Sequence, residues 1–218
     1  ETPLLRLVEQ LRGDLDLSKV PNLIYKKDGE VKVNRPFAKE ELNALPTPDF
    51  DGLPLDLYLS PERVLPVMGS RGCYWEQCAF CSIPFDHMTF HVRYAENVVN
   101  DFKTLQEKYN CNNFFFTDEA LPINFLRTFA AKIIEEKVDV QWTGELKFEK
   151  SLLRDDRMEL LYKSGCRKLI FGLESYNQRV LDSMKKGVEL SWVDETAEQC
   201  MKLGIAMHFY LICGFPTE

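Results

Sequence analysis

The sequence predicts an α/β protein, a partial parallel barrel of about five strands that follows a short helix, a hairpin and a linker. Two observations carry this prediction. From Val64 onward, short apolar runs alternate with segments of helical periodicity. Before Val64, the chain is rich in proline and shows one helical pattern and one hairpin pattern. Strands that alternate with helices form parallel sheets with right-handed crossovers, which can close partly or wholly into a barrel.

The N-terminal segment predicts two small elements. Thr2 can cap a helix, Pro3 suits its first turn and Gly13 can end it. The run LIYKKDGEVKV then alternates on both sides of an Asp-Gly pair, which predicts a β-hairpin.

The organisation of the chain changes after the hairpin. Prolines gather in the following stretch, and each removes a backbone donor and restrains the residue before it. We therefore expect a linker segment at residues 1–45, a proline-rich connector at residues 46–63 and a core at residues 64–218.

The core is expected to contain five strands, separated by the cysteine loop and by helices. The last strand is almost continuously apolar, so we expect it to be buried on both faces. A capping box of Ser191 and Asp194 predicts the start of the final helix. The expected strands are 64–68, 113–118, 138–144, 167–175 and 205–213, and the helices lie around 98–109 and 126–134, at 151–164, in a short turn before Gly187 and at 191–204.

Three cysteines, Cys73, Cys78 and Cys81, follow the first strand, at the edge of a parallel sheet where ligands bind. A structural zinc site or an electron-carrying iron–sulfur cluster usually has four protein ligands. The trio therefore either has a partner elsewhere or leaves one metal position open. Two readings follow: a four-iron cluster with an open iron, or a non-catalytic interaction module in which His87 completes a zinc site.

The cysteine loop, with Phe80 just before its last cysteine, resembles the cluster-binding loop of the radical S-adenosylmethionine (SAM) superfamily. The likeness runs from about Val64 to the end, although the first two cysteines are one residue further apart than is commonest there. It implies that Cys73, Cys78 and Cys81 bind a [4Fe-4S] cluster and that Phe80 lies at the cofactor site. It also implies that SAM chelates the open iron and is cleaved reductively to a 5′-deoxyadenosyl radical.

The same resemblance nominates residues at other strand ends. Asp118 and Glu119, in FTDEAL, match the place where the family binds the methionine amino group. Glu174 and Ser175, in FGLES, match the segment near the ribose and carboxylate. Gly214, in LICGFPTE, matches a position where the backbone approaches the adenosyl group.

The extended motif RGCYW and the linker before it resemble the subclass that carries a cobalamin-binding domain ahead of the barrel. This implies cobalamin in the parent enzyme and cobalamin-dependent methyl transfer as its reaction, with methylthiolation or another radical reaction as the alternative. It also implies that the cobalamin domain and a sixth strand lie outside this chain, so we expect no methyl transfer by the chain alone. The sequence does not identify the substrate, which is a small molecule or a peptide. An external electron donor is expected.

The composition of the chain limits its cellular compartment and its classes of partner. No apolar run approaches the length of a membrane span, and the N-terminus lacks the pattern of a signal peptide. With seven irregularly spaced cysteines, this predicts a cytoplasmic protein with reduced thiols and no membrane partner. The formal net charge of -7 disfavours nucleic acid as a partner.

Overall fold

The computed structural model describes all residues except 14, 37–39, 84–88 and 217. The chain forms two compact units, residues 1–44 and residues 45–218. No helix in the described part of the chain is both long and apolar enough to cross a membrane.

The first unit contains the predicted helix and hairpin. Helix α1 spans Thr2–Arg12, and strands β1 (Ile24–Lys27) and β2 (Glu30–Val33) pair antiparallel. The turn between them is left-handed, with φ of 52° at Asp28 and 82° at Gly29, as a two-residue hairpin requires. Thr2 is not the cap of α1 but lies inside it, because the helix already begins at that residue.

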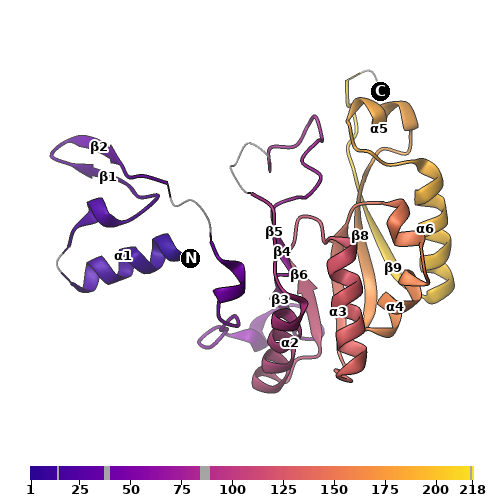
Figure 1. The fold of residues 1–218 in the computed structure, drawn as a ribbon, viewed down its shortest axis with the longest axis horizontal. Coiled ribbons are helices and arrows are strands. Elements are labelled where there is room, and N and C mark those ends of the chain that lie inside the picture. The colour runs from indigo at the N-terminus through magenta and orange to yellow at the C-terminus, as the bar shows by residue number, and fades with distance from the viewer. Residues whose placement is uncertain (14, 37–39, 84–88, 217) are drawn as a thin grey trace. The chain divides into compact units, whose positions relative to one another are not determined.

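The second unit is built on a five-stranded sheet in which all neighbouring strands are parallel (Figure 1). The strands follow one another across the sheet in chain order, as a barrel requires. They are β3 (Val64–Val67), β6 (Asn113–Phe116), β7 (Gln141–Leu146), β8 (Cys166–Glu174) and β9 (Ala206–Leu211). The predicted fold class, a partial parallel barrel, is confirmed.

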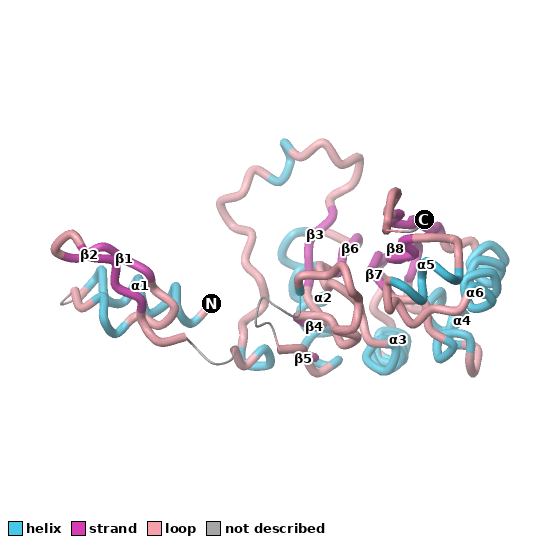
Figure 2. Tube along the Cα trace, turned by 90° about the horizontal axis from the view of Figure 1, so that it is seen from above, coloured by secondary structure: helices cyan, strands magenta, loops and turns pink. Residues whose placement is uncertain are grey.

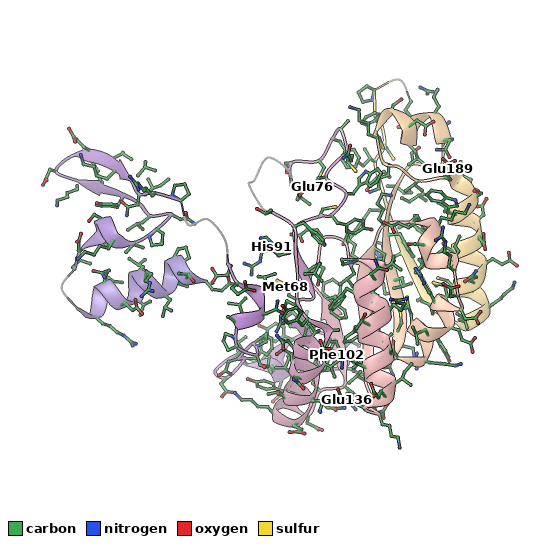
Figure 3. All side chains as sticks on the ribbon, in the orientation of Figure 1. Met68, Glu76, His91, Phe102, Glu136 and Glu189 are labelled. Atoms are coloured by element: carbon green, nitrogen blue, oxygen red, sulfur yellow. The ribbon has the colours of Figure 1, made fainter. Side chains whose placement is uncertain are left out.

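The main helices cover one face of this sheet and leave its other face open (Figure 2). The core lies between these helices and the sheet; Phe102 of α2, labelled in Figure 3, is fully buried there, 4.2 Å from Phe114 between ring centroids. The covering helices are α2 (Ala95–Tyr109), α3 (Ile123–Glu135), α4 (Arg157–Lys163) and α6 (Leu190–Leu203), whereas α5 (Gln178–Ser183) lies at the carboxyl end of the strands (Figure 1). Short 3-10 turns occur in the first unit at Leu17–Lys19 and Leu42–Ala44, and in the second unit at Leu55–Leu57 and Lys150–Leu153.

The helix expected at 151–164 was wrong in its first half. The chain forms a 3-10 turn and begins α4 only at Arg157, because Asp155 and Asp156 adopt left-handed conformations with φ of 54° and 52°. The Ser191 capping box was also wrong, since α6 begins one residue earlier, at Leu190.

Strand β9 lies at the edge of the sheet and is not buried on both faces. Met207 and Phe209 pack against the core, whereas His208 and Tyr210 are exposed on the open face. The expectation of two buried faces failed because helices cover only one side of this strand.

Candidate active site

The cysteine loop begins and ends beside the carboxyl end of β3. Two short strands, β4 (Ser70–Arg71) and β5 (His91–Val92), pair antiparallel and close the base of the loop. The loop and α5 lie at the same end of the sheet in Figure 1, and Figure 3 labels Glu76 on the loop and His91 at its base. The topology therefore brings the thiols to the edge where parallel sheets bind ligands.

Asp118, at the end of β6, holds this base in place. Its carboxylate accepts hydrogen bonds from the Gly69 N–H at 3.0 and 3.1 Å, from the Ser70 hydroxyl at 2.6 Å and from the Ser70 N–H. Burial raises the pKa of Asp118 to about 6, although these hydrogen bonds oppose the rise. These hydrogen bonds tie the Asp118 carboxylate to the base of the cysteine loop.

Glu119, the next residue, extends the same support. Its Oε2 accepts a hydrogen bond of 3.0 Å from the N–H of Gly72, directly before Cys73. Gly72 has a φ of 80°, a conformation that favours glycine. Glu119 is partly buried, so the carboxylate lies beside the start of the cysteine loop while keeping contact with solvent.

The three thiols of the loop are free and partly exposed. Burial raises the pKa of the Cys78 thiol. The charges of Cys73 and Cys81 raise this pKa further, whereas those of Lys186 and Lys147 lower it, so these four groups lie within electrostatic range of Cys78. Within the described residues, no three His, Cys, Asp or Glu side chains are grouped to hold a metal ion. Three thiolates that each bind a different iron of a cluster need not converge on one point, so this arrangement of donors is compatible with a cluster. His87, the fourth ligand of the zinc alternative, lies outside the described residues.

A buried ion pair lies at the end of β8. Lys186 Nζ donates a hydrogen bond of 2.8 Å to Glu174 Oε1, and both side chains are 11% exposed. Gly172 leaves the room for this pair, because a Cβ at that position would lie 2.7 Å from Glu174 Oε1 and 2.8 Å from Lys186 Nζ. Glu174 also has a φ of 65°, and strained backbone of this kind gathers at functional sites.

Glu145 joins this group from β7. Its side chain is partly buried, and burial raises its pKa to about 7. Lys186 lowers that pKa, whereas Glu174 and Glu119 raise it, so the three carboxylates share one electrostatic environment. Glu174 thus contacts the Lys186 ammonium group directly, and Glu145 lies within electrostatic range of Lys186, Glu174 and Glu119.

The remaining predicted residues lie around this group with fewer contacts. Phe80 is 39% exposed, and its ring centroid is 5.8 Å from Lys186 Nζ. Ser175 is buried beyond β8, where its N–H donates to the carbonyl of Leu173 at 2.8 Å. Gly214 has a φ of 79° and open space where a Cβ would lie, so nothing in the described structure crowds its backbone.

Sequence reasoning missed two members of the site. Glu145 occupies the open-facing side of its strand, but the residues TGEL do not distinguish a ligand-facing carboxylate from an exposed one. Lys186 follows α5 in a run of two lysines, which resembles an ordinary solvated surface. Only the folding of the turn after α5 brings Lys186 onto Glu174.

Glu145 gives the metal-free chain a testable dependence on pH. A carboxyl whose folded pKa exceeds its unfolded pKa stabilises the fold at low pH and loses that contribution as pH rises through the folded value. We expect Glu145→Gln to match the parent near pH 4.5 and to be more stable by about 1–2 kcal/mol near pH 8, since the partly exposed group limits the effect. Urea unfolding of both chains across this range measures the difference, and parallel stability curves would contradict the assignment.

Sequence comparison finds relatives among methyltransferases. The chain is 28% identical over 222 residues to an uncharacterized methyltransferase of Pyrococcus horikoshii, covering 97% of this chain and 47% of that protein. It is 27% identical over 160 residues to the bacteriochlorophyllide d C-12(1)-methyltransferase of Chlorobaculum tepidum, covering 72% of this chain and 35% of that protein. The chain spans less than half the length of either relative.

Solved structures share the fold. The radical S-adenosylmethionine methyltransferase TsrM from Kitasatospora setae, with cobalamin and a [4Fe-4S] cluster bound, matches with a TM-score of 0.79 at 16% identity, over 99% of this chain and 46% of that one. The cobalamin-dependent S-adenosylmethionine radical enzyme OxsB matches with a TM-score of 0.74 at 20% identity, over 97% of this chain and 32% of that one. At these identities the likeness establishes the architecture.

The family follows from a match that covers most of the chain. The model of the radical SAM superfamily matches residues 67–218, which include the cysteine loop and all five strands except the first residues of β3. The chain belongs to the radical SAM superfamily.

Proposed function

We propose that this chain is the catalytic core of a radical SAM enzyme, in which Cys73, Cys78 and Cys81 hold a [4Fe-4S] cluster with one open iron. The observation that carries the proposal is the placement of three free thiols and of the carboxylate–lysine group, which is Glu145, Glu174 and Lys186, at one edge of a partial parallel barrel. When bound, the cluster would supply the electron, received from an external donor, that cleaves SAM to methionine and a 5′-deoxyadenosyl radical. The chain's own part is to bind and orient SAM.

The charges of the site suit SAM. SAM carries two cationic groups, an ammonium and a sulfonium, and one carboxylate. Glu119, Glu145 and Glu174 supply negative charge at the strand ends, while Lys186 is a buried cation that can receive the carboxylate. A neutral Glu145 would become charged as the cationic ligand approaches, because an opposite charge lowers the pKa of a carboxyl.

For the whole protein we propose cobalamin-dependent methyl transfer. Relatives named as methyltransferases support this, and so do structural neighbours described as cobalamin-dependent. Methylthiolation or another radical reaction is the alternative within the superfamily. The substrate, a small molecule or a peptide, would lie against the open face of the sheet, where His208 and Tyr210 are exposed.

Reductive cleavage of SAM tests the proposed chemistry. After anaerobic reconstitution with iron and sulfide, the reduced chain is expected to form 5′-deoxyadenosine from SAM, because the thiols and the carboxylate–lysine group would hold cluster and SAM together. Without substrate, the 5′-deoxyadenosyl radical takes its hydrogen atom from buffer or protein. The product is quantified by liquid chromatography, and the unreduced sample is the control.

Metal analysis of the same preparation separates this proposal from the zinc-stabilised module. Iron and sulfide in equal amounts support the enzyme. A single tightly held zinc ion, with no sulfide and no 5′-deoxyadenosine, would establish the non-catalytic alternative.

A further inference from the structure

The tip of the cysteine loop is docked on the turn that carries Lys186. The indole Nε1–H of Trp75 donates a hydrogen bond of 2.9 Å to the carbonyl of Lys185. The N–H of Ala79 donates one of the same length to the carbonyl of Met184. Two residues of the loop, on either side of Cys78, are therefore tied to the residues just before Lys186.

The indole ring of Trp75 also requires glycine beneath it. Gly187 has a φ of 61°, and a Cβ there would lie 2.2 Å and 2.4 Å from two ring carbons of Trp75. No side chain fits in that distance, so the ring packs directly on the backbone of the turn. Glycine at position 187 serves the contact as well as the left-handed conformation.

Lys147 also stabilises the contact between Trp75 and Gly187. Its Nζ lies 4.1 Å from the centroid of the Trp75 ring, within the range of a cation–π interaction. The same Nζ donates a hydrogen bond of 2.7 Å to the carbonyl of Gly187. Lys147, the residue directly after β7, is 6% exposed, so a buried cation contacts both the loop and the turn.

The contacts of Trp75 and Lys147 lie on both sides of Lys186. Its neighbours Lys185 and Gly187 accept the hydrogen bonds from Trp75 and Lys147, while its own ammonium group pairs with Glu174. A displacement of the loop tip would therefore pull on the residues on both sides of Lys186. In the proposed site, SAM has to reach the thiol loop and Lys186 at the same time.

We propose that Trp75, seated on Gly187 and Lys147, is a positioning residue that sets the thiol loop at the correct distance from the Lys186–Glu174 pair for SAM to bind both. This rests on the proposed function and adds to it a residue outside the proposed iron ligands and SAM-binding charges. The contact works through preorganisation: because the loop is already docked, SAM binding does not carry the entropic cost of ordering it.

The test compares Trp75→Ala and Gly187→Ala with a matched control, Trp192→Ala, which removes a partly buried tryptophan of α6 outside the site. In the iron-free chains, hydrogen exchange is expected to speed up at the amide of Ala79 and in residues 184–187 for the two site variants only. In the reconstituted chains, both site variants should keep the parent's iron content and bind SAM about tenfold more weakly, which corresponds to a lost interaction of ordinary strength. Affinity is read from the change that SAM produces in the electron paramagnetic resonance signal of the reduced cluster.

Rescue separates positioning from simple folding. Trp75→Phe keeps a ring on Gly187 but lacks the N–H, so its affinity should lie between those of the parent and Trp75→Ala. Affinity within about twofold of the parent in Trp75→Ala, despite faster exchange in the turn, would overturn the positioning role. Loss of iron in both site variants would overturn it as well, because the contact would then only maintain the loop. Failure of the parent chain to respond to SAM would instead refute the proposed function.

Discussion

Replacing Cys73, Cys78 or Cys81 by alanine is expected to abolish the cluster, taking iron from about four atoms per reconstituted chain to nearly none. Each thiolate would bind a different iron, and within the described residues no other cysteine lies in this loop. Iron and sulfide analysis with the optical absorption of the reconstituted protein measures the result. SAM cleavage should disappear in the same three variants.

Two cysteines outside the loop provide the controls. Cys111 is buried and its thiol donates to the carbonyl of Arg63 at 3.2 Å, whereas Cys213 is exposed and as accessible to added iron as the loop. Cys111→Ala and Cys213→Ala should both retain the cluster. Equal loss in Cys213→Ala, or full retention without Cys78, would show that the ligands have been assigned wrongly.

Lys186→Met is expected to destabilise the iron-free chain by about 3–5 kcal/mol, because it leaves the buried Glu174 carboxylate without its cation. Methionine keeps most of the side-chain volume, so packing contributes little to the loss. Urea unfolding near neutral pH measures the change.

The double variant Lys186→Met with Glu174→Gln distinguishes stability from ligand binding. Removing both charges should restore most of the lost stability, since no uncompensated charge remains buried. SAM affinity should remain weak, because neither a cation for its carboxylate nor the paired carboxylate is left. A double variant that binds SAM like the parent would show that this ion pair is structural only.

The sequence alone determined the architecture of the core and the identity of the thiol loop. Apolar runs that alternate with helical patterns mark parallel strands and crossovers, because each element must bury one face or both. Those strands carry their own residues to the carboxyl edge, so Glu174 and Cys73 could be placed together from topology. Sequence reasoning failed where the local backbone conformation set the start of a helix. Asp155 and Asp156 adopt left-handed conformations that interrupt a helical pattern.

Roles within the site depended on contacts between distant segments. Asp118 and Glu119 are adjacent in sequence and were predicted to act alike, yet the first is occupied by the backbone of Gly69 and Ser70 and the second supports Gly72. No periodicity encodes that difference, since it depends on how the end of β3 turns past β6.

Tertiary structure alone decided which cations belong to the site and how the cysteine loop is held. Lys186 follows Cys78 by more than a hundred residues and looks like a surface residue in the sequence, but the turn after α5 buries it against Glu174. Trp75 looks like an exposed loop residue until Gly187 is found beneath its ring. Short-range sequence patterns report the face that each element buries, whereas buried charge pairs and loop docking require partners that meet only after the sheet has formed.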